Sequence, residues 1–188
     1  MKSRAATEVA HLEHLTAGLA DPTDLDVAIH TTRTGIKRLR AFLRLARQSI
    51  GTSTYRTEND ALGHTARLLA PARDAYVLIE TARELGATDR IVAELSEDHT
   101  RAIAALEAGS RIEAVHGLEA TTDRWRLLEW HGPDSLSIGA GLARTYGRGL
   151  SDLETVRTAP ASTSFHRWRR RVKYLRYQLE ALDAPDRV

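Results

Sequence analysis

Apolar residues recur along the chain at the three- and four-residue spacing that places them on one face of an α-helix. Nowhere does a period-two alternation persist long enough to predict a strand. Glycine and proline, including Pro22, Gly51, Pro71, Gly86 and Gly109, divide the pattern into segments. The chain is therefore predicted to be all-α, with eight helices at about residues 3–19, 24–49, 55–69, 72–85, 89–108, 111–128, 136–157 and 164–182.

A polar pattern of the second predicted helix occurs again in the eighth. The residues are His30, Arg33, Lys37 and Arg40 and, 136 positions later, His166, Arg169, Lys173 and Arg176. The apolar residues between them recur in the same register, so that Ile36, Leu39 and Leu43 correspond to Val172, Leu175 and Leu179. This match in chemistry and register indicates an internal duplication.

On a helix of roughly 100° per residue, the repeated cations run beside the apolar face, not opposite it. Arg44 and Arg47 extend the first stripe, and Phe165 should lie on the apolar side of the second. Like charges one turn apart repel each other, so stability alone does not favour such a stripe. A single basic stripe could simply be the solvated face of a helix, and the histidine at its head could be a packed structural residue. Two stripes in register favour a groove that binds an anion.

Charge distribution supports this interpretation more than net charge does. The chain of 188 residues has 27 basic and 25 acidic residues, a formal net charge of +2. Each of the stretches 30–47 and 166–176 nevertheless has six Lys or Arg and no Asp or Glu. Two concentrated basic segments on an otherwise acidic chain suggest a polyanionic partner at a defined place.

Several function classes are not expected. The absence of cysteine excludes disulfides, thiolate metal sites and thiol nucleophiles. The sequence has no apolar run of about 18 residues and no secretory signal, so we expect a cytoplasmic protein with no membrane partner. His11 and His14 are close enough in sequence to share a metal, but no acidic cluster supports them, and we expect no metal and no cofactor.

Four segments resemble the CHAD family, the conserved histidine α-helical domain: residues 28–44, 69–78, 146–149 and 165–177. The resemblance implies an all-α fold of two pseudo-symmetric bundles of antiparallel helices within a single domain, with halves at about 1–109 and 110–188. It also implies binding of inorganic polyphosphate in a basic groove, without catalysis and in association with polyphosphate granules.

The resemblance assigns polyphosphate-binding residues by position. They are His30, Arg33, Lys37, Arg40, Arg44, His166, Arg169, Lys173 and Arg176, with Arg47 and Arg73 as additions. Asp74 is expected to orient an arginine and not to touch the anion.

Two departures from the family pattern lead to further expectations. Family members usually continue beyond the second basic helix, whereas this chain ends at Val188. The second bundle is therefore expected to be incomplete, and three explanations stay open: the sequence is a fragment, the second bundle is reduced, or a second copy completes it in a homodimer. Glu180 stands where the first copy has Arg44, so the second stripe should be shorter and the site asymmetric.

Two alternative functions remain open at this stage. Nucleic-acid binding would use the same cations, although stacking aromatics beside the stripes are scarce. A metal-dependent phosphohydrolase would need carboxylates near the anion, and the basic segments have none in sequence.

Overall fold

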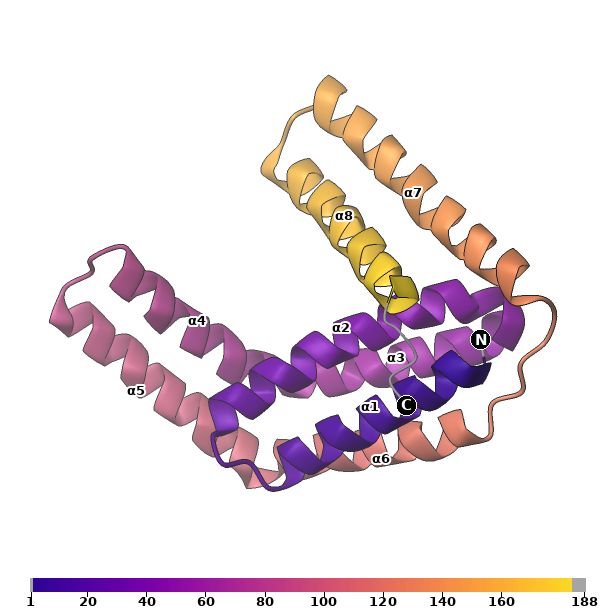
Figure 1. The fold of residues 1–188 in the computed structure, drawn as a ribbon. Coiled ribbons are helices and arrows are strands. Elements are labelled where there is room, and N and C mark those ends of the chain that lie inside the picture. Colours follow the sequence, from indigo (N-terminus) through magenta and orange to yellow (C-terminus); the bar gives the residue numbers. More distant parts are fainter. Residues whose placement is uncertain (1, 184–188) are drawn as a thin grey trace. The chain divides into compact units, whose positions relative to one another are not determined.

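The computed structural model describes residues 2–183, and these residues form an all-α helical bundle (Figure 1). All eight predicted helices are present. Their bounds are α1 (Lys2–Ala20), α2 (Leu25–Ile50), α3 (Thr52–Leu68), α4 (Ala70–Glu84), α5 (Asp89–Ala105), α6 (Arg111–Arg126), α7 (Asp134–Thr158) and α8 (Ser162–Asp183). None of the described helices contains a stretch long and apolar enough to cross a bilayer.

The helix ends follow local backbone chemistry. Gly51, between α2 and α3, has a φ of 82°, which a residue with a side chain adopts only at a cost. Pro71 lies in the first turn of α4, where the backbone N–H that proline lacks would have no helical partner. The proline therefore begins a new helix, and only Leu69 separates α4 from α3. A π-helical turn, η1 (Leu106–Ser110), connects α5 to α6 across a kink at Gly109.

The described residues divide into two compact units, and the bounds of these units differ from the two sequence halves that the family resemblance implied. Unit 1 comprises the described parts of Met1–Glu8, Lys37–Asn59 and Leu127–Val188. Unit 2 comprises Val9–Ile36 and Asp60–Arg126. Helix α6, which lies in the second half implied by the resemblance, belongs with α4 and α5 in unit 2.

Unit 2 is built around the apolar faces of α1, the N-terminal part of α2, α3 and α6. Its core side chains are completely or almost completely buried; they include Leu12, Leu15, Leu19, Ile29, Ile36, Leu62, Leu69 and Leu118. Burial of each such side chain contributes about 1.5–3 kcal/mol. Helix α5, by contrast, has no fully buried residue and packs as a hairpin with α4.

Unit 1 joins the C-terminal part of α2 to the α7–α8 hairpin. Leu39 and Leu43 are completely buried, which confirms the apolar face predicted for this helix. Phe42 and Leu45, which were not assigned to that face, are at most 1% exposed as well. Helix α7 approaches α2 at Gly141, where an added Cβ would lie 2.7 Å from Leu45 Cα.

The apolar face predicted for α8 is wrong. Phe165, Val172 and Leu179 are 49%, 49% and 46% exposed, while Tyr177 and Gln178 are buried. The reason is that α8 turns its other side, which includes Arg171 and Tyr174, toward α7 and α2, as the contacts described below show.

Candidate anion-binding site

The structure brings the two basic helices together within unit 1. The Arg44 guanidinium of α2 lies over the Tyr174 ring of α8, 4.0 Å from its centroid. Arg38 Nε lies 3.9 Å from Glu180 Oε2, which is a second contact between α2 and α8. These contacts join residues more than 120 positions apart in sequence.

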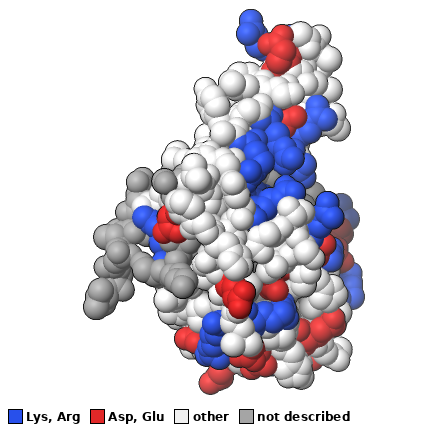
Figure 2. Space-filling view, turned by 90° about the vertical axis from the view of Figure 1, so that its right-hand side faces the viewer, with Lys and Arg blue, Asp and Glu red and all other residues white. Residues whose placement is uncertain are grey.

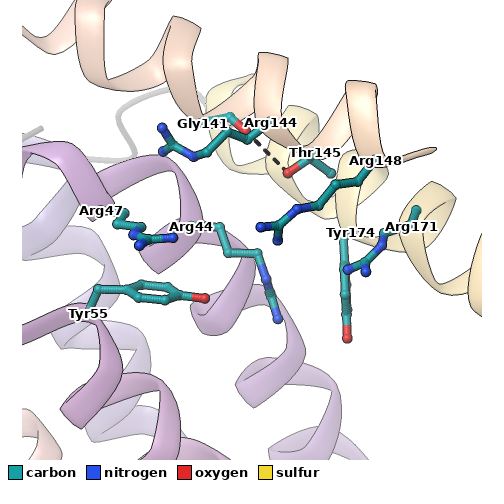
Figure 3. Close-up of a pocket in the computed structure, with 9 residues that line it drawn as sticks. All are labelled: Arg44, Arg47, Tyr55, Gly141, Arg144, Thr145, Arg148, Arg171 and Tyr174. Carbon is teal, nitrogen blue, oxygen red and sulfur yellow. Dashed lines mark hydrogen bonds between the residues drawn. The ribbon is translucent and has the colours of Figure 1, made fainter. Parts of the chain in front are cut away.

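A small pocket lies beside this crossing (Figure 3), with a cavity volume of about 30 Å³. It is formed by side chains of α2, α3, α7 and α8 and by one glycine of α7. The lining residues are Arg44, Arg47, Tyr55, Gly141, Arg144, Thr145, Arg148, Arg171 and Tyr174. We call this set the arginine pocket.

Helical spacing explains how each element presents its cations. Arg44 and Arg47 are three residues apart on α2, and Arg144 and Arg148 are four residues apart on α7, so each pair shares a helix face. Gly141 lies one turn before Arg144 and lets α7 come close enough for its arginines to reach those of α2. Arg171 and Tyr174 share a face of α8 in the same way.

The arginine pocket has five guanidinium groups and no acidic lining residue. Arg171 Nε is 3.1 Å from Asp152 Oδ2, but this carboxylate is shared with Arg167, whose Nε is 2.9 Å from Oδ1. Arg44 donates to the Arg40 carbonyl oxygen at 2.7 Å. Arg144 Nη2 is buried and forms no hydrogen bond with any residue that the structure describes. The cations are thus only partly compensated by the protein.

Burial has an electrostatic consequence at Arg44. Its pKa is lowered from its ordinary value, first by removal of the guanidinium from water, and further by the nearby cations Arg40 and Arg171. Tyr174 and Tyr55 act in the opposite direction and favour the charged form. A charged group that is desolvated next to other cations costs free energy, and an anion bound in the pocket would offset this cost.

The first predicted stripe is divided by the structure. Arg44 and Arg47 line the pocket. Arg40 and Lys37 also belong to unit 1, where Arg40 Nε donates to Asn59 Oδ1 at 3.0 Å and Lys37 is exposed. His30, which is exposed on α2, belongs to unit 2.

Arg33 and Arg73 also belong to unit 2, and both have acidic partners there. Arg33 donates to the Ala66 carbonyl oxygen at 2.6 Å, and its Nη2 lies 3.7 Å from Asp74 Oδ1. Burial lowers the pKa of Arg33, while Asp74 raises it. The expectation that Asp74 orients an arginine is consistent with this contact. Arg73 Nη1 lies 3.6 Å from Glu80 Oε2.

The second predicted stripe does not line the pocket. His166, Arg169, Lys173 and Arg176 are exposed on α8, and Arg176 Nε pairs with Glu180 Oε1 at 3.1 Å. Because α8 is rotated relative to the prediction, the α8 cation in the pocket is Arg171.

Sequence reasoning missed six polar lining residues: Tyr55, Arg144, Thr145, Arg148, Arg171 and Tyr174. The spacing of Arg144 and Arg148 one turn after Gly141 was a usable signal, because it places two cations on a helix face that has room for close packing. No local pattern singled out Tyr55.

The space-filling view agrees with this distribution. Figure 2 shows Lys and Arg side chains gathered below the tip of the α7–α8 hairpin with few acidic side chains among them. Among residues 2–183, no three His, Asp or Glu side chains are grouped as metal ligands would be.

The fold and the pocket together define an all-α protein with a pocket lined by five arginines. The family model for the CHAD domain matches residues 4–184, nearly the whole chain, and the chain therefore belongs to the CHAD domain family. Comparisons with curated proteins and with solved structures find no match.

Proposed function

We propose that this chain binds inorganic polyphosphate in the arginine pocket and does not act as a catalyst. The observation that carries the proposal is the convergence of five arginines from three helices on a pocket without an acidic lining residue. CHAD domains are known in polyphosphate-binding proteins, which is consistent with a phosphate-rich ligand.

Arginine is suited to this ligand for geometric reasons. Its planar guanidinium donates two parallel hydrogen bonds to phosphate oxygens and keeps its charge when partly desolvated. The buried Arg144 Nη2, which has no acceptor among the described residues, would gain one from a phosphate oxygen. A hydrogen bond to this donor should contribute more binding free energy than a hydrogen bond to an exposed donor, because a buried donor without a partner is costly.

The alternative of nucleic-acid binding is less well supported by the pocket. Stacking of bases needs free aromatic faces. One face of Tyr174 is covered by Arg44 at 4.0 Å, and Arg47 lies over Tyr55 at 5.1 Å from the ring centroid. The two tyrosine rings are thus in contact with arginines. The pocket offers guanidinium groups for phosphate but no free aromatic face on which a base could stack.

A competition titration tests the proposal. Labelled long-chain polyphosphate is bound to the protein and displaced with unlabelled polyphosphate, single-stranded DNA or duplex DNA at several salt concentrations. We expect polyphosphate to compete best at every salt concentration, and affinity to fall linearly with the logarithm of salt. Equal or tighter binding of either DNA at physiological salt would refute the proposal.

Three double variants with the same change of charge locate the site. Arg144→Ala with Arg148→Ala removes two pocket cations, Arg169→Ala with Lys173→Ala removes two stripe cations, and Arg67→Ala with Arg83→Ala removes two exposed cations of unit 2.

We expect about tenfold or greater loss of affinity for the pocket variant only, with a salt slope reduced by about one per lost contact. A larger loss in the stripe variant than in the pocket variant would place the site on the outer face of α8.

A further inference from the structure

One carboxylate, that of Asp152 on α7, is linked to the arginine pocket without lining it. Its Oδ2 atom lies 3.1 Å from Arg171 Nε, and its Oδ1 atom lies 2.9 Å from Arg167 Nε. Arg171 lines the pocket, whereas Arg167 does not. Both oxygens of the carboxylate thus have a cationic partner, and Asp152 is connected to the pocket through Arg171.

Arg171 is held near another cation. The pKa of Arg44 is lowered, first by burial and further by Arg40 and Arg171, so the guanidinium groups of Arg44 and Arg171 are close enough to repel each other. This repulsion favours rotamers that carry the Arg171 side chain away from the pocket. Holding a long arginine side chain in one rotamer also costs conformational entropy. A contact that keeps Arg171 at the pocket must therefore offset both effects.

The contact with Asp152 can do this and still leave donors for a ligand. The carboxylate accepts a hydrogen bond from Arg171 Nε, and the planar guanidinium then fixes the directions of both Nη groups. A guanidinium has five N–H donors, so donors remain on both Nη nitrogens. The side chains of Asp152 and Arg171 are only 14% and 23% exposed, so water and salt screen this pair less than a surface pair. An arginine that is ordered before the ligand arrives costs less to order on binding.

We propose that Asp152 is a positioning residue of the arginine pocket, which holds Arg171 so that its Nη groups donate to oxygens of a bound polyphosphate. This inference rests on the proposed function. It predicts the sign of a substitution. A carboxylate repels a nearby polyanion, so removal of its charge should by itself raise polyphosphate affinity. If Asp152 positions Arg171, the same removal lowers polyphosphate affinity.

The experiment compares two variants with the same change of charge on α7. Asp152→Asn removes the carboxylate at Arg171, and Glu154→Gln removes an exposed carboxylate that lies 3.7 Å from Arg157. Long-chain polyphosphate is titrated calorimetrically into the full chain at several salt concentrations. We expect Asp152→Asn to weaken binding about three- to tenfold and Glu154→Gln not to weaken it. The salt slope should fall by about one in Asp152→Asn, although no cation is removed, because Arg171 no longer contacts phosphate.

A double-mutant cycle separates positioning from a purely structural role in the α7–α8 hairpin. In the Arg171→Ala background, Asp152 has no pocket cation to position, so Asp152→Asn should leave polyphosphate affinity unchanged or raise it. A structural role would lower affinity by the same factor in both backgrounds, and this result would overturn the inference.

Arg171→Lys gives a second test that does not depend on the folding of Asp152→Asn. The lysine keeps the charge, but its single ammonium group cannot contact the carboxylate and a phosphate with the geometry of a guanidinium. We therefore expect Arg171→Lys to weaken binding about three- to tenfold as well. Wild-type affinity in this variant would overturn the inference.

Failure of this inference is distinguishable from failure of the proposed function. If the wild-type chain binds long-chain polyphosphate and Asp152→Asn binds it as tightly or more tightly, only the positioning role is overturned. An equal loss of affinity in Asp152→Asn and Glu154→Gln also overturns that role alone. If long-chain polyphosphate does not bind the wild-type chain, both the inference and the proposed function are overturned.

Discussion

Substitution of Gly141 by alanine should separate helix propensity from helix packing in α7. In the interior of a helix, alanine is more favourable than glycine by about 1 kcal/mol. At Gly141, however, the new Cβ would lie 2.7 Å from Leu45 Cα and 3.0 Å from the Arg44 carbonyl oxygen. Both atoms belong to the backbone of α2, so the contact is relieved only if α7 moves away from α2.

The size of the effect follows from these two opposing terms. Overpacking of this kind costs about 1–3 kcal/mol, which cancels or exceeds the propensity gain. We therefore expect Gly141→Ala to change the free energy of unfolding by between about zero and −2 kcal/mol. Polyphosphate affinity should fall as well, because Arg144 and Arg148 would move together with α7.

Two other glycines of α7 provide matched controls. Neither Gly139 nor Gly147 has another atom within 4 Å of an added Cβ. In their alanine variants the free energy of unfolding should rise by up to about 1 kcal/mol, and polyphosphate affinity should equal that of the wild type. The assays are urea denaturation and calorimetric titration. If Gly141→Ala stabilises the chain as much as Gly139→Ala, the close approach of α7 to α2 is refuted.

Three further predictions concern single side chains. Tyr174→Phe should retain polyphosphate affinity, and Tyr174→Leu should lose part of it, because the contact of the aromatic ring with Arg44 contributes about 0.5–2 kcal/mol. Calorimetric titration measures both affinities, and equal values for the two variants would contradict this role of the ring. Burial raises the pKa of Glu8 from 4.5 to about 7, against the opposing effect of Arg38 and Arg4. The folded chain then binds a proton that the unfolded chain has lost, so stability should fall as pH rises from about 4.5 to about 7. Glu8→Gln should flatten this part of the denaturation profile, and an equally steep profile in the variant would contradict it. Finally, Val172→Ala should lower the free energy of unfolding by less than about 1 kcal/mol, because Val172 is 49% exposed. Leu43 is fully buried, and Leu43→Ala should lower it by about 2–5 kcal/mol. A core-like cost at Val172 would mean that this face is covered in solution, and sedimentation velocity would then show whether a second copy covers it.

Much of the fold could be predicted from the sequence, because helix periodicity and chain breaks are local properties. The eight helices were predicted within a few residues of their bounds. The buried face of α2 was predicted for the same reason, since Ile36, Leu39 and Leu43 form one continuous apolar stripe with cations on one side. Arg44 and Arg47 were found because they extend that stripe.

The composition of the pocket depended on tertiary structure. Helix α8 has apolar residues on more than one side, so its own pattern does not determine which side faces α2 and α7. Contacts of Tyr174 with Arg44 and of Arg171 with Asp152 determine that rotation. They leave Val172 exposed and put Arg171, instead of Lys173, into the pocket.

Sequence alone thus determined that the chain is helical, that its cations are concentrated in two segments, and that one segment lies beside a core face. Only the tertiary structure determined that α7 supplies Arg144 and Arg148 next to Arg44. The physical reason is that a helical pattern records which side of a helix is apolar. The identity of the neighbour depends on contacts between residues that are distant in sequence, such as Gly141 and Leu45.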